Sequence, residues 1–165
     1  ADPYCHGGGL HAHTVGGKLD LHLDYSRHPL SGLERRFNLI VYLNERWDAS
    51  YGGALELWAP SDANPLAPGA LCAKVVPTYN RAILFDTAAP AFHGFPRPLS
   101  CPDNEQGRSL ALYYLTPPGP HAPSRSRALY VPAPGDPADP ALDALRAIRS
   151  VRRLEASDLA AHPPA

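Results

Sequence analysis

The sequence predicts an all-β jelly roll that ends in one helix. Apolar and polar residues alternate with period two over short runs, turn signals recur about every ten residues, and the 20 prolines and 13 glycines gather between those runs. Short strands that are regularly interrupted by turns are typical of sandwiches and barrels, whereas alternating β and α units would show helical periodicity between the strands. One such domain suits a length of 165 residues.

Glycine pairs mark two of the turns, Gly16-Gly17 after the first run and Gly52-Gly53 before the fourth. Residues 37–44 are a nearly continuous run of β-favouring side chains, which indicates a strand covered on both faces. The expected strands, with the last one a weaker candidate, are 10–14, 18–24, 37–44, 54–58, 72–77, 81–86, 109–116 and 128–132.

The C-terminal part has a different composition. Residues 117–140 are rich in Pro, Ala and Ser, which indicates an extended linker and not a core segment. Asp139 then suits an N-cap with Pro140 at the first helical position, and an apolar stripe continues to Leu154. We therefore expect a β-rich domain over 1–132, and a linker with a helix of about four turns over 133–165.

Charge and cysteine content exclude several classes of protein. Fifteen basic residues balance 16 acidic ones, so neither nucleic acid nor a membrane is an expected partner. Cys5, Cys72 and Cys101 show no C-x-x-C spacing and are expected to be reduced thiols. Without an apolar run that could span a bilayer, the expectation is a soluble cytoplasmic monomer or homodimer, with an N-terminus that can be incomplete because the chain has no Met.

The residues that indicate chemistry are His22 and Asp24, joined later by His93. Side chains at i and i+2 of a strand point to the same face, so His22 and Asp24 can converge on one ion. A second strand must then bring His93. Two imidazoles and one carboxylate on one side of an octahedral ion leave the opposite positions open, an arrangement that suits non-heme Fe(II).

With Arg108 after His93, this set resembles the Fe(II)/2-oxoglutarate-dependent dioxygenase superfamily, most closely its prolyl 4-hydroxylase-like branch. The resemblance covers residues 10–116. Its further motifs are Tyr42-Leu43-Asn44 followed by Trp47, Gly52-Gly53 with Leu55 and Leu57, and Phe85-Asp86 shortly before His93.

The resemblance implies a double-stranded β-helix, which is the cupin-like form of the jelly roll, with His22, Asp24 and His93 as ligands of Fe(II). It implies 2-oxoglutarate and dioxygen as cosubstrates, with ascorbate an open option. Arg108 would bind the distal carboxylate of 2-oxoglutarate, because a guanidinium fork offers two parallel hydrogen bonds to a carboxylate. Tyr42 would donate its hydroxyl to the same carboxylate, and Asn38 lies four residues earlier on the same strand face.

One departure from the family pattern concerns Arg108. Some relatives have Arg-x-Ser at the cosubstrate arginine, whereas here Ser109 follows Arg108 directly and Leu110 takes the second position. If Arg108 lies on the inner face of its strand, it is buried and needs a partner, and Ser109 faces away.

The implied activity is hydroxylation of an unactivated C–H bond, with a prolyl residue in a peptide or a small molecule as the substrate. Asp24 favours hydroxylation, because related halogenases lack this carboxylate. Two alternatives stay open: a catalytically silent or sensory β-helix, and a cupin-like metal protein, for which His11 and His13 would offer an H-x-H pair but no following Glu. The resemblance also leads us to expect that the N-terminal helices of the family are missing from this sequence, which would leave one sheet face exposed.

Overall fold

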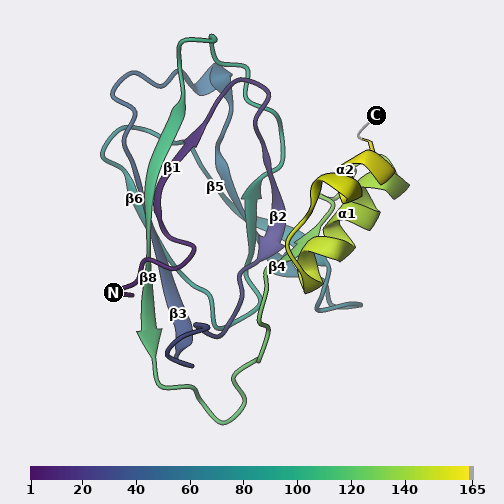
Figure 1. Ribbon diagram of the computed structural model, residues 1–165. Coiled ribbons are helices and arrows are strands. Elements are labelled where there is room, and N and C mark those ends of the chain that lie inside the picture. The colour runs from purple at the N-terminus through teal and green to yellow at the C-terminus, as the bar shows by residue number, and fades with distance from the viewer. Residues whose placement is uncertain (164–165) are drawn as a thin grey trace.

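The computed structural model describes residues 1–163 as two antiparallel sheets that face each other (Figure 1). The four-stranded sheet contains, in spatial order, β1 (Gly9–His13), β8 (Gly107–Thr116), β3 (Glu34–Tyr42) and β6 (Ala82–Asp86). The five-stranded sheet contains β5 (Pro68–Val75), β4 (Leu55–Pro60), β7 (Phe92–Phe95), β2 (Leu19–Leu23) and β9 (Leu129–Val131). This confirms the predicted jelly roll.

The helices lie outside the sandwich. A 3-10 helix, η1 (Ala49–Tyr51), sits in a loop, and α1 (Pro140–Val151) and α2 (Ala156–Ala161) end the chain beside the five-stranded sheet (Figure 1). Helix α1 begins where the sequence predicts, since the Asp139 carboxylate accepts a hydrogen bond from the Leu142 amide at 2.9 Å. Helix α2 is not predicted. Within residues 1–163, none of the helices has the length and apolar character needed to traverse a bilayer.

Helix α1 covers the outer face of the five-stranded sheet at its β9 and β2 edge. It packs against β9, and its Arg146 donates from Nε to the Asp20 carboxylate of β2 at 2.9 Å. Leu21, Leu23 and Phe92 on this face are 0%, 2% and 0% exposed. The segment after residue 132 therefore contributes to the same hydrophobic core as the strands.

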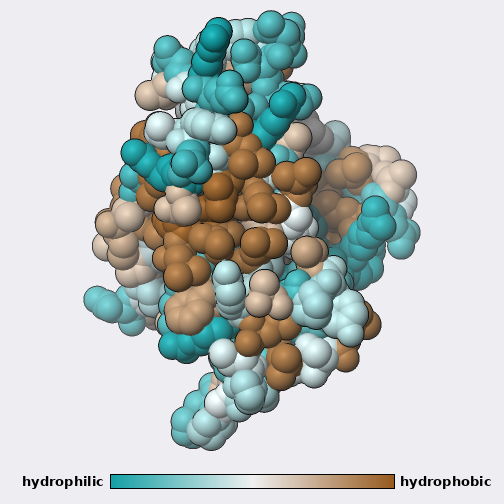
Figure 2. All heavy atoms as spheres, turned by 90° about the vertical axis from the view of Figure 1, so that its left-hand side faces the viewer, coloured by the Kyte–Doolittle hydropathy of each residue, from teal (hydrophilic) through white to brown (hydrophobic). Residues whose placement is uncertain are grey.

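The outer face of the four-stranded sheet is apolar and open to solvent (Figure 2). The strand registers place eight large side chains there, which are Leu10, Phe37, Leu39, Val41, Leu84, Leu110, Leu112 and Tyr114. Leu10 is 78% and Leu84 58% exposed. The expectation that β3 is covered on both faces is therefore wrong for the part of the chain that the structure describes. The run in β3 is nearly continuously apolar because its outward residues, Phe37, Leu39 and Val41, are large and apolar although they face solvent.

Strand β7 is the element that the sequence pattern does not reveal. It is four residues long and stands between Pro90 and Pro96, so it has too few residues to show an alternation. It lies between β4 and β2, with His93 directly opposite His22. This pairing brings the third residue of the predicted set to the other two.

We expect Leu21→Ala to lower the free energy of unfolding by about 2 to 5 kcal/mol, because it opens a cavity between β2 and α1. Leu84→Ala removes the same atoms from an exposed position and should change stability by less than about 0.5 kcal/mol. Urea denaturation of both variants measures the difference. Equal losses would contradict the assignment of the two sheet faces.

Candidate metal centre

His22, Asp24 and His93 form one compact cluster. His22 lies on β2, Asp24 follows the end of that strand, and His93 lies on the neighbouring β7. His22 Nε2 is 3.7 Å from Asp24 Oδ1, and His93 Nε2 is 3.6 Å from Asp24 Oδ2. All three ligand atoms lie within 4.8 Å of one another, and all three residues are buried.

Backbone carbonyls fix the orientation of both imidazoles. Nδ1 of His22 lies 3.0 Å from the Asp20 carbonyl oxygen, and Nδ1 of His93 lies 3.0 Å from the Ala91 carbonyl oxygen. A carbonyl only accepts, so each Nδ1 must carry the proton. Each Nε2 then keeps a lone pair on the side of Asp24, and a carbonyl that holds the other ring N–H is the arrangement of metal-binding histidines.

The electrostatics of the cluster suit a cation. Burial and the neighbouring His93 lower the pKa of His22 to about 4, so its ring is neutral near pH 7. Burial by itself would raise the pKa of Asp24, but His93, His22 and Arg35 outweigh it and hold that pKa below its usual value. The cluster therefore offers the neutral imidazole of His22 and the carboxylate of Asp24, beside the imidazole of His93.

Asp24 also has an unused acceptor. Its Oδ1 accepts from the Tyr113 hydroxyl at 3.2 Å, whereas its buried Oδ2 has no hydrogen-bond partner among residues 1–163. A buried carboxylate oxygen without a partner costs free energy, and a bound divalent ion would remove that cost. These residues therefore fit a metal ion with nitrogen and oxygen ligands.

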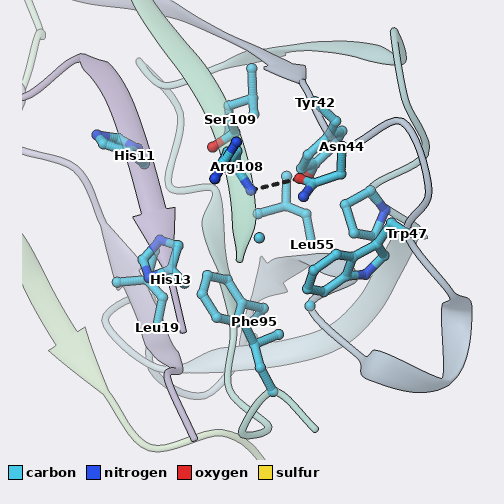
Figure 3. A pocket seen from close by; sticks show the side chains of 15 residues that line it. His11, His13, Leu19, Tyr42, Asn44, Trp47, Leu55, Phe95, Arg108 and Ser109 are labelled. Carbon is cyan, nitrogen blue, oxygen red and sulfur yellow. Dashed lines mark hydrogen bonds between the residues drawn. The ribbon is translucent and has the colours of Figure 1, made fainter. Parts of the chain in front are cut away.

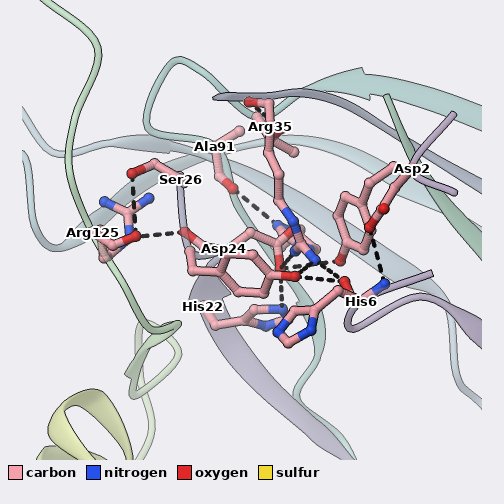
Figure 4. A network of polar contacts seen from close by, with 12 residues as sticks. Asp2, His6, His22, Asp24, Ser26, Arg35, Ala91 and Arg125 are labelled. Atoms are coloured by element: carbon pink, nitrogen blue, oxygen red, sulfur yellow. Dashed lines mark hydrogen bonds and ion pairs between the residues drawn. The ribbon is translucent and has the colours of Figure 1, made fainter. Parts of the chain in front are cut away.

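A polar network holds Asp24 in place (Figure 4). The Arg35 guanidinium approaches Asp24 Oδ1 to 3.8 Å, and Arg125 donates from Nε to the Asp24 carbonyl oxygen at 2.8 Å. The Arg125 carbonyl oxygen in turn accepts from the Ser26 amide at 2.8 Å. The side chain of Asp24 and the backbone from Asp24 to Ser26 are thus both held by polar contacts. These contacts fix the orientation of Asp24 relative to His22.

The cluster opens into a cavity of about 670 Å³. Part of its wall comes from the C-terminal third of the chain, where Tyr130 on β9 stacks on the His22 ring at 5.1 Å and the Arg149 guanidinium lies 3.8 Å from the centre of the Tyr130 ring. Arg127 donates to the Arg149 carbonyl oxygen at 3.0 Å and closes this corner. The segment that composition presents as a linker therefore forms part of the site. Tyr130 and Tyr113 have no recognisable signal in the sequence.

Arg108 does not reach this cavity. It is exposed, because β8 turns its even-numbered residues to the outer face of the sheet and its odd-numbered residues inward. In the register of β3 and β8, Tyr42 lies directly opposite Ser109. Ser109 therefore shares the inner face with Tyr42, and Arg108 lies on the outer face. The expectation of a buried Arg108 is wrong, and so is the expectation that Ser109 faces away.

The inward position next to Arg108 is Gly107. A Cβ atom added there would lie 3.4 Å from Trp47 Cη2 and 3.5 Å from Leu99 Cδ1, so these side chains pack where a longer residue would extend. The surrounding cavity is small, about 80 Å³, and largely apolar (Figure 3). Arg108 contributes its backbone amide, which donates to Asn44 Oδ1 at 2.6 Å.

Tyr42 and Asn38 share the inner face of β3, as the sequence predicts from their spacing. Tyr42 is 7% exposed and lines the smaller cavity, and burial raises its pKa to about 12, so the phenol keeps its proton. Asn38 is 2% exposed and lines the larger cavity, with no partner for Oδ1 among the described residues. His11 and His13 of β1 lie between the two cavities and contact both.

Replacing His93 by alanine should weaken binding of Co(II) at least about 100-fold, since it removes one of three donors, and losing only the hydrogen-bond partner of a metal ligand already costs about 10- to 100-fold. His11→Ala, a matched histidine outside the cluster, should leave the affinity unchanged. The visible absorption of Co(II) during a titration gives both values, with circular dichroism to check folding. A His93→Ala protein that binds Co(II) like the wild type would exclude this cluster.

Comparison with known proteins agrees with this geometry. The model of the 2OG-Fe(II) oxygenase superfamily matches residues 8–116. Prolyl 3-hydroxylase OGFOD1 of Xenopus laevis is 35% identical over 66 residues, which are 40% of this chain and 12% of that protein.

Two solved structures are also similar. A prolyl-4-hydroxylase of Pseudomonas putida has 22% identity and a TM-score of 0.45 over 64% of this chain and 49% of its own. A prolyl 4-hydroxylase of Phytophthora capsici has 23% identity and a TM-score of 0.48 over 86% of this chain and 41% of its own. The chain thus spans less than half the length of these relatives.

The family implies Fe(II), 2-oxoglutarate and dioxygen as cofactor and cosubstrates, and the histidine and carboxylate donors of the cluster fit the iron. The family model covers most of the chain, including all three clustered residues and the strands that carry them. The chain therefore belongs to the 2OG-Fe(II) oxygenase superfamily.

Proposed function

We propose that the chain is an Fe(II)- and 2-oxoglutarate-dependent dioxygenase that hydroxylates an unactivated C–H bond, and that its substrate is a prolyl residue of a peptide. The observation that carries the proposal is the cluster of His22, Asp24 and His93, with an unpaired Asp24 Oδ2 among the described residues. A prolyl substrate is supported by the similarity to a curated prolyl 3-hydroxylase.

The chemistry that Fe(II), 2-oxoglutarate and dioxygen supply when bound is oxidative decarboxylation of the cosubstrate to succinate, coupled to hydroxylation of a C–H bond. The protein supplies the geometry. His22, Asp24 and His93 would occupy one side of the ion, and the cavity lies on the other side, where cosubstrate and substrate must meet. Asp24 gives the site a full set of three protein ligands, which favours hydroxylation over halogenation.

The surrounding side chains keep that geometry constant. The Asp20 and Ala91 carbonyl groups hold the two imidazoles in the Nδ1–H tautomer, and Tyr113 donates to the carboxylate. The rings of Tyr113 and Tyr130 also limit the access of water to the ligands, because Tyr113 is buried beside Asp24 and the half-buried Tyr130 stacks on His22. A dry and fixed site protects a reactive oxidation from side reactions.

A second candidate is a silent or sensory protein that binds metal without turnover. The observation that favours it is the outward orientation of Arg108 together with glycine at the inward position 107. In this case, the cavity would bind metal, but 2-oxoglutarate would not be consumed. A small-molecule substrate is a third option, and it shares the chemistry of the first.

Succinate formation tests the proposal. Wild-type protein loaded with Fe(II) and 2-oxoglutarate without oxygen, then exposed to air, should form succinate, and Asp24→Ala should form at least about 100-fold less because the site loses its charged ligand. Asp62→Ala, which removes an exposed loop carboxylate, is the control. Peptides that contain proline should increase the yield over the same peptides with alanine in its place.

The outcomes separate the candidates. Stimulation that is independent of proline would favour a small-molecule substrate. Metal binding without succinate from the wild type would favour the silent protein.

A further inference from the structure

We propose that Arg35 of β3, and not Arg108 of β8, binds the distal carboxylate of 2-oxoglutarate. The inference rests on the proposed function, because it concerns how the same site holds its cosubstrate. It starts from the finding that the inner end of β8 offers no cation to the cavity. Position 107 is glycine there, and Trp47 and Leu99 fill the adjacent space.

Arg35 is a cation inside the site. It is 1% exposed, lines the same 670 Å³ cavity as the metal cluster, and places Nη1 3.8 Å from Asp24 Oδ1. A β-bulge puts it there. Strand β3 shifts register between Arg35 and Phe37, so Arg35 points inward although Phe37 points outward. Arg36 takes the outward place and pairs with Asp86 at 2.9 Å.

The guanidinium has unused donors. Among the described residues, Nε has no hydrogen-bond partner, and Nη1 approaches Asp24 only to 3.8 Å, which is beyond hydrogen-bond distance. Nη2 donates to the Tyr25 hydroxyl and to the His6 carbonyl oxygen. A buried arginine with free N–H groups needs an acceptor, and a ligand carboxylate is the acceptor that matches its planar fork.

Two tyrosines hold the guanidinium rigidly. The Cζ atom of Arg35 lies 3.3 Å from the centre of the Tyr25 ring and 3.4 Å from the centre of the Tyr113 ring. Stacking between aromatic faces stabilises the cation and fixes its plane. The Arg35 side chain is therefore already ordered before a carboxylate binds, so binding does not cost the conformational entropy of this side chain.

The charges of the site favour a dianion. Arg35 and Asp24 cancel each other, so a bound divalent ion leaves a net charge of about +2 that burial makes costly. A 2-oxoglutarate dianion would neutralise it.

Two other basic residues that line the cavity, Arg149 and His13, are weaker candidates. Arg149 is exposed and is engaged with Tyr130. Burial and His11 lower the pKa of His13, so its ring is largely neutral near pH 7.

A simpler role for Arg35 would be to position Asp24 through their ion pair. That role predicts weaker metal binding in a variant and an equal effect on every 2-oxo acid. Direct binding of the distal carboxylate predicts a loss that depends on that carboxylate. Comparing the binding of 2-oxo acids with and without a distal carboxylate therefore distinguishes the two roles, whereas a measurement of activity would not.

The test compares 2-oxoglutarate with 2-oxopentanoate, which differs by having a methyl group at C5. Binding to the Fe(II) protein is measured without oxygen by calorimetry, at metal concentrations that saturate each variant. Wild type should prefer 2-oxoglutarate by at least about 30-fold, as expected for a buried charge pair. Arg35→Gln should reduce the preference to about twofold or less, and Arg35→Lys should reduce it partly, because the charge stays but the fork is lost. Arg108→Gln is the matched control and should keep the wild-type preference.

An unchanged preference in folded Arg35→Gln would overturn the inference, and so would its loss in Arg108→Gln. If the wild-type metal protein binds neither 2-oxo acid, the proposed function fails together with the inference, which is a different result. Should Arg35→Gln not fold, the Arg35 Nε–H resonance of the ¹⁵N-labelled wild-type Zn(II) protein, assigned with Arg35→Lys, replaces it. It should shift with 2-oxoglutarate and not with 2-oxopentanoate, and equal shifts would overturn the inference.

Discussion

The buried carboxylate of Asp24 is the constraint on which the site depends. A charge in this position is tolerated because the Arg35 guanidinium lies beside it and the Tyr113 hydroxyl donates to it. Its second oxygen still has no hydrogen-bond partner within residues 1–163. The folded chain therefore presents Asp24 Oδ2 as a free acceptor for a cation. The two sheets around it bury this oxygen away from bulk water.

Strand pairing places the other residues of the site around Asp24. Strand β2 carries His22 and ends just before Asp24, with β7 on one side and β9 on the other. The short β7 supplies His93, and β9 supplies Tyr130, which stacks on His22. Helix α1 covers the opposite face of β2 and is anchored by Arg146 on Asp20. Segments that differ in composition thus have the same structural role. They hold β2, the strand that carries His22, at both of its edges and on its outer face.

Much of the fold and the metal cluster follows from local pattern, and the rest depends on register. The local sequence pattern predicts eight of the nine strands of the described chain, with β9 the weakest of them, and the i, i+2 spacing of His22 and Asp24, because both are properties of a single strand. It fails for Arg35 and Arg108. Counting from Asn38 in steps of two places residue 36 inward, and only the bulge in β3 brings Arg35 inside instead. Arg108 is outward because β8 pairs with β3 through Ser109 opposite Tyr42, which no local pattern reveals.

By itself the sequence determined the jelly-roll class, the N-cap of α1 and the three residues able to bind a metal, since each depends on residue type and near neighbours. Only the tertiary structure decided which cation faces the cavity, that the C-terminal segment closes the site, and that one face of the four-stranded sheet is exposed in the described chain. The physical reason is that a one-residue shift in pairing turns every following side chain to the other face. Such shifts are settled by contacts between distant strands.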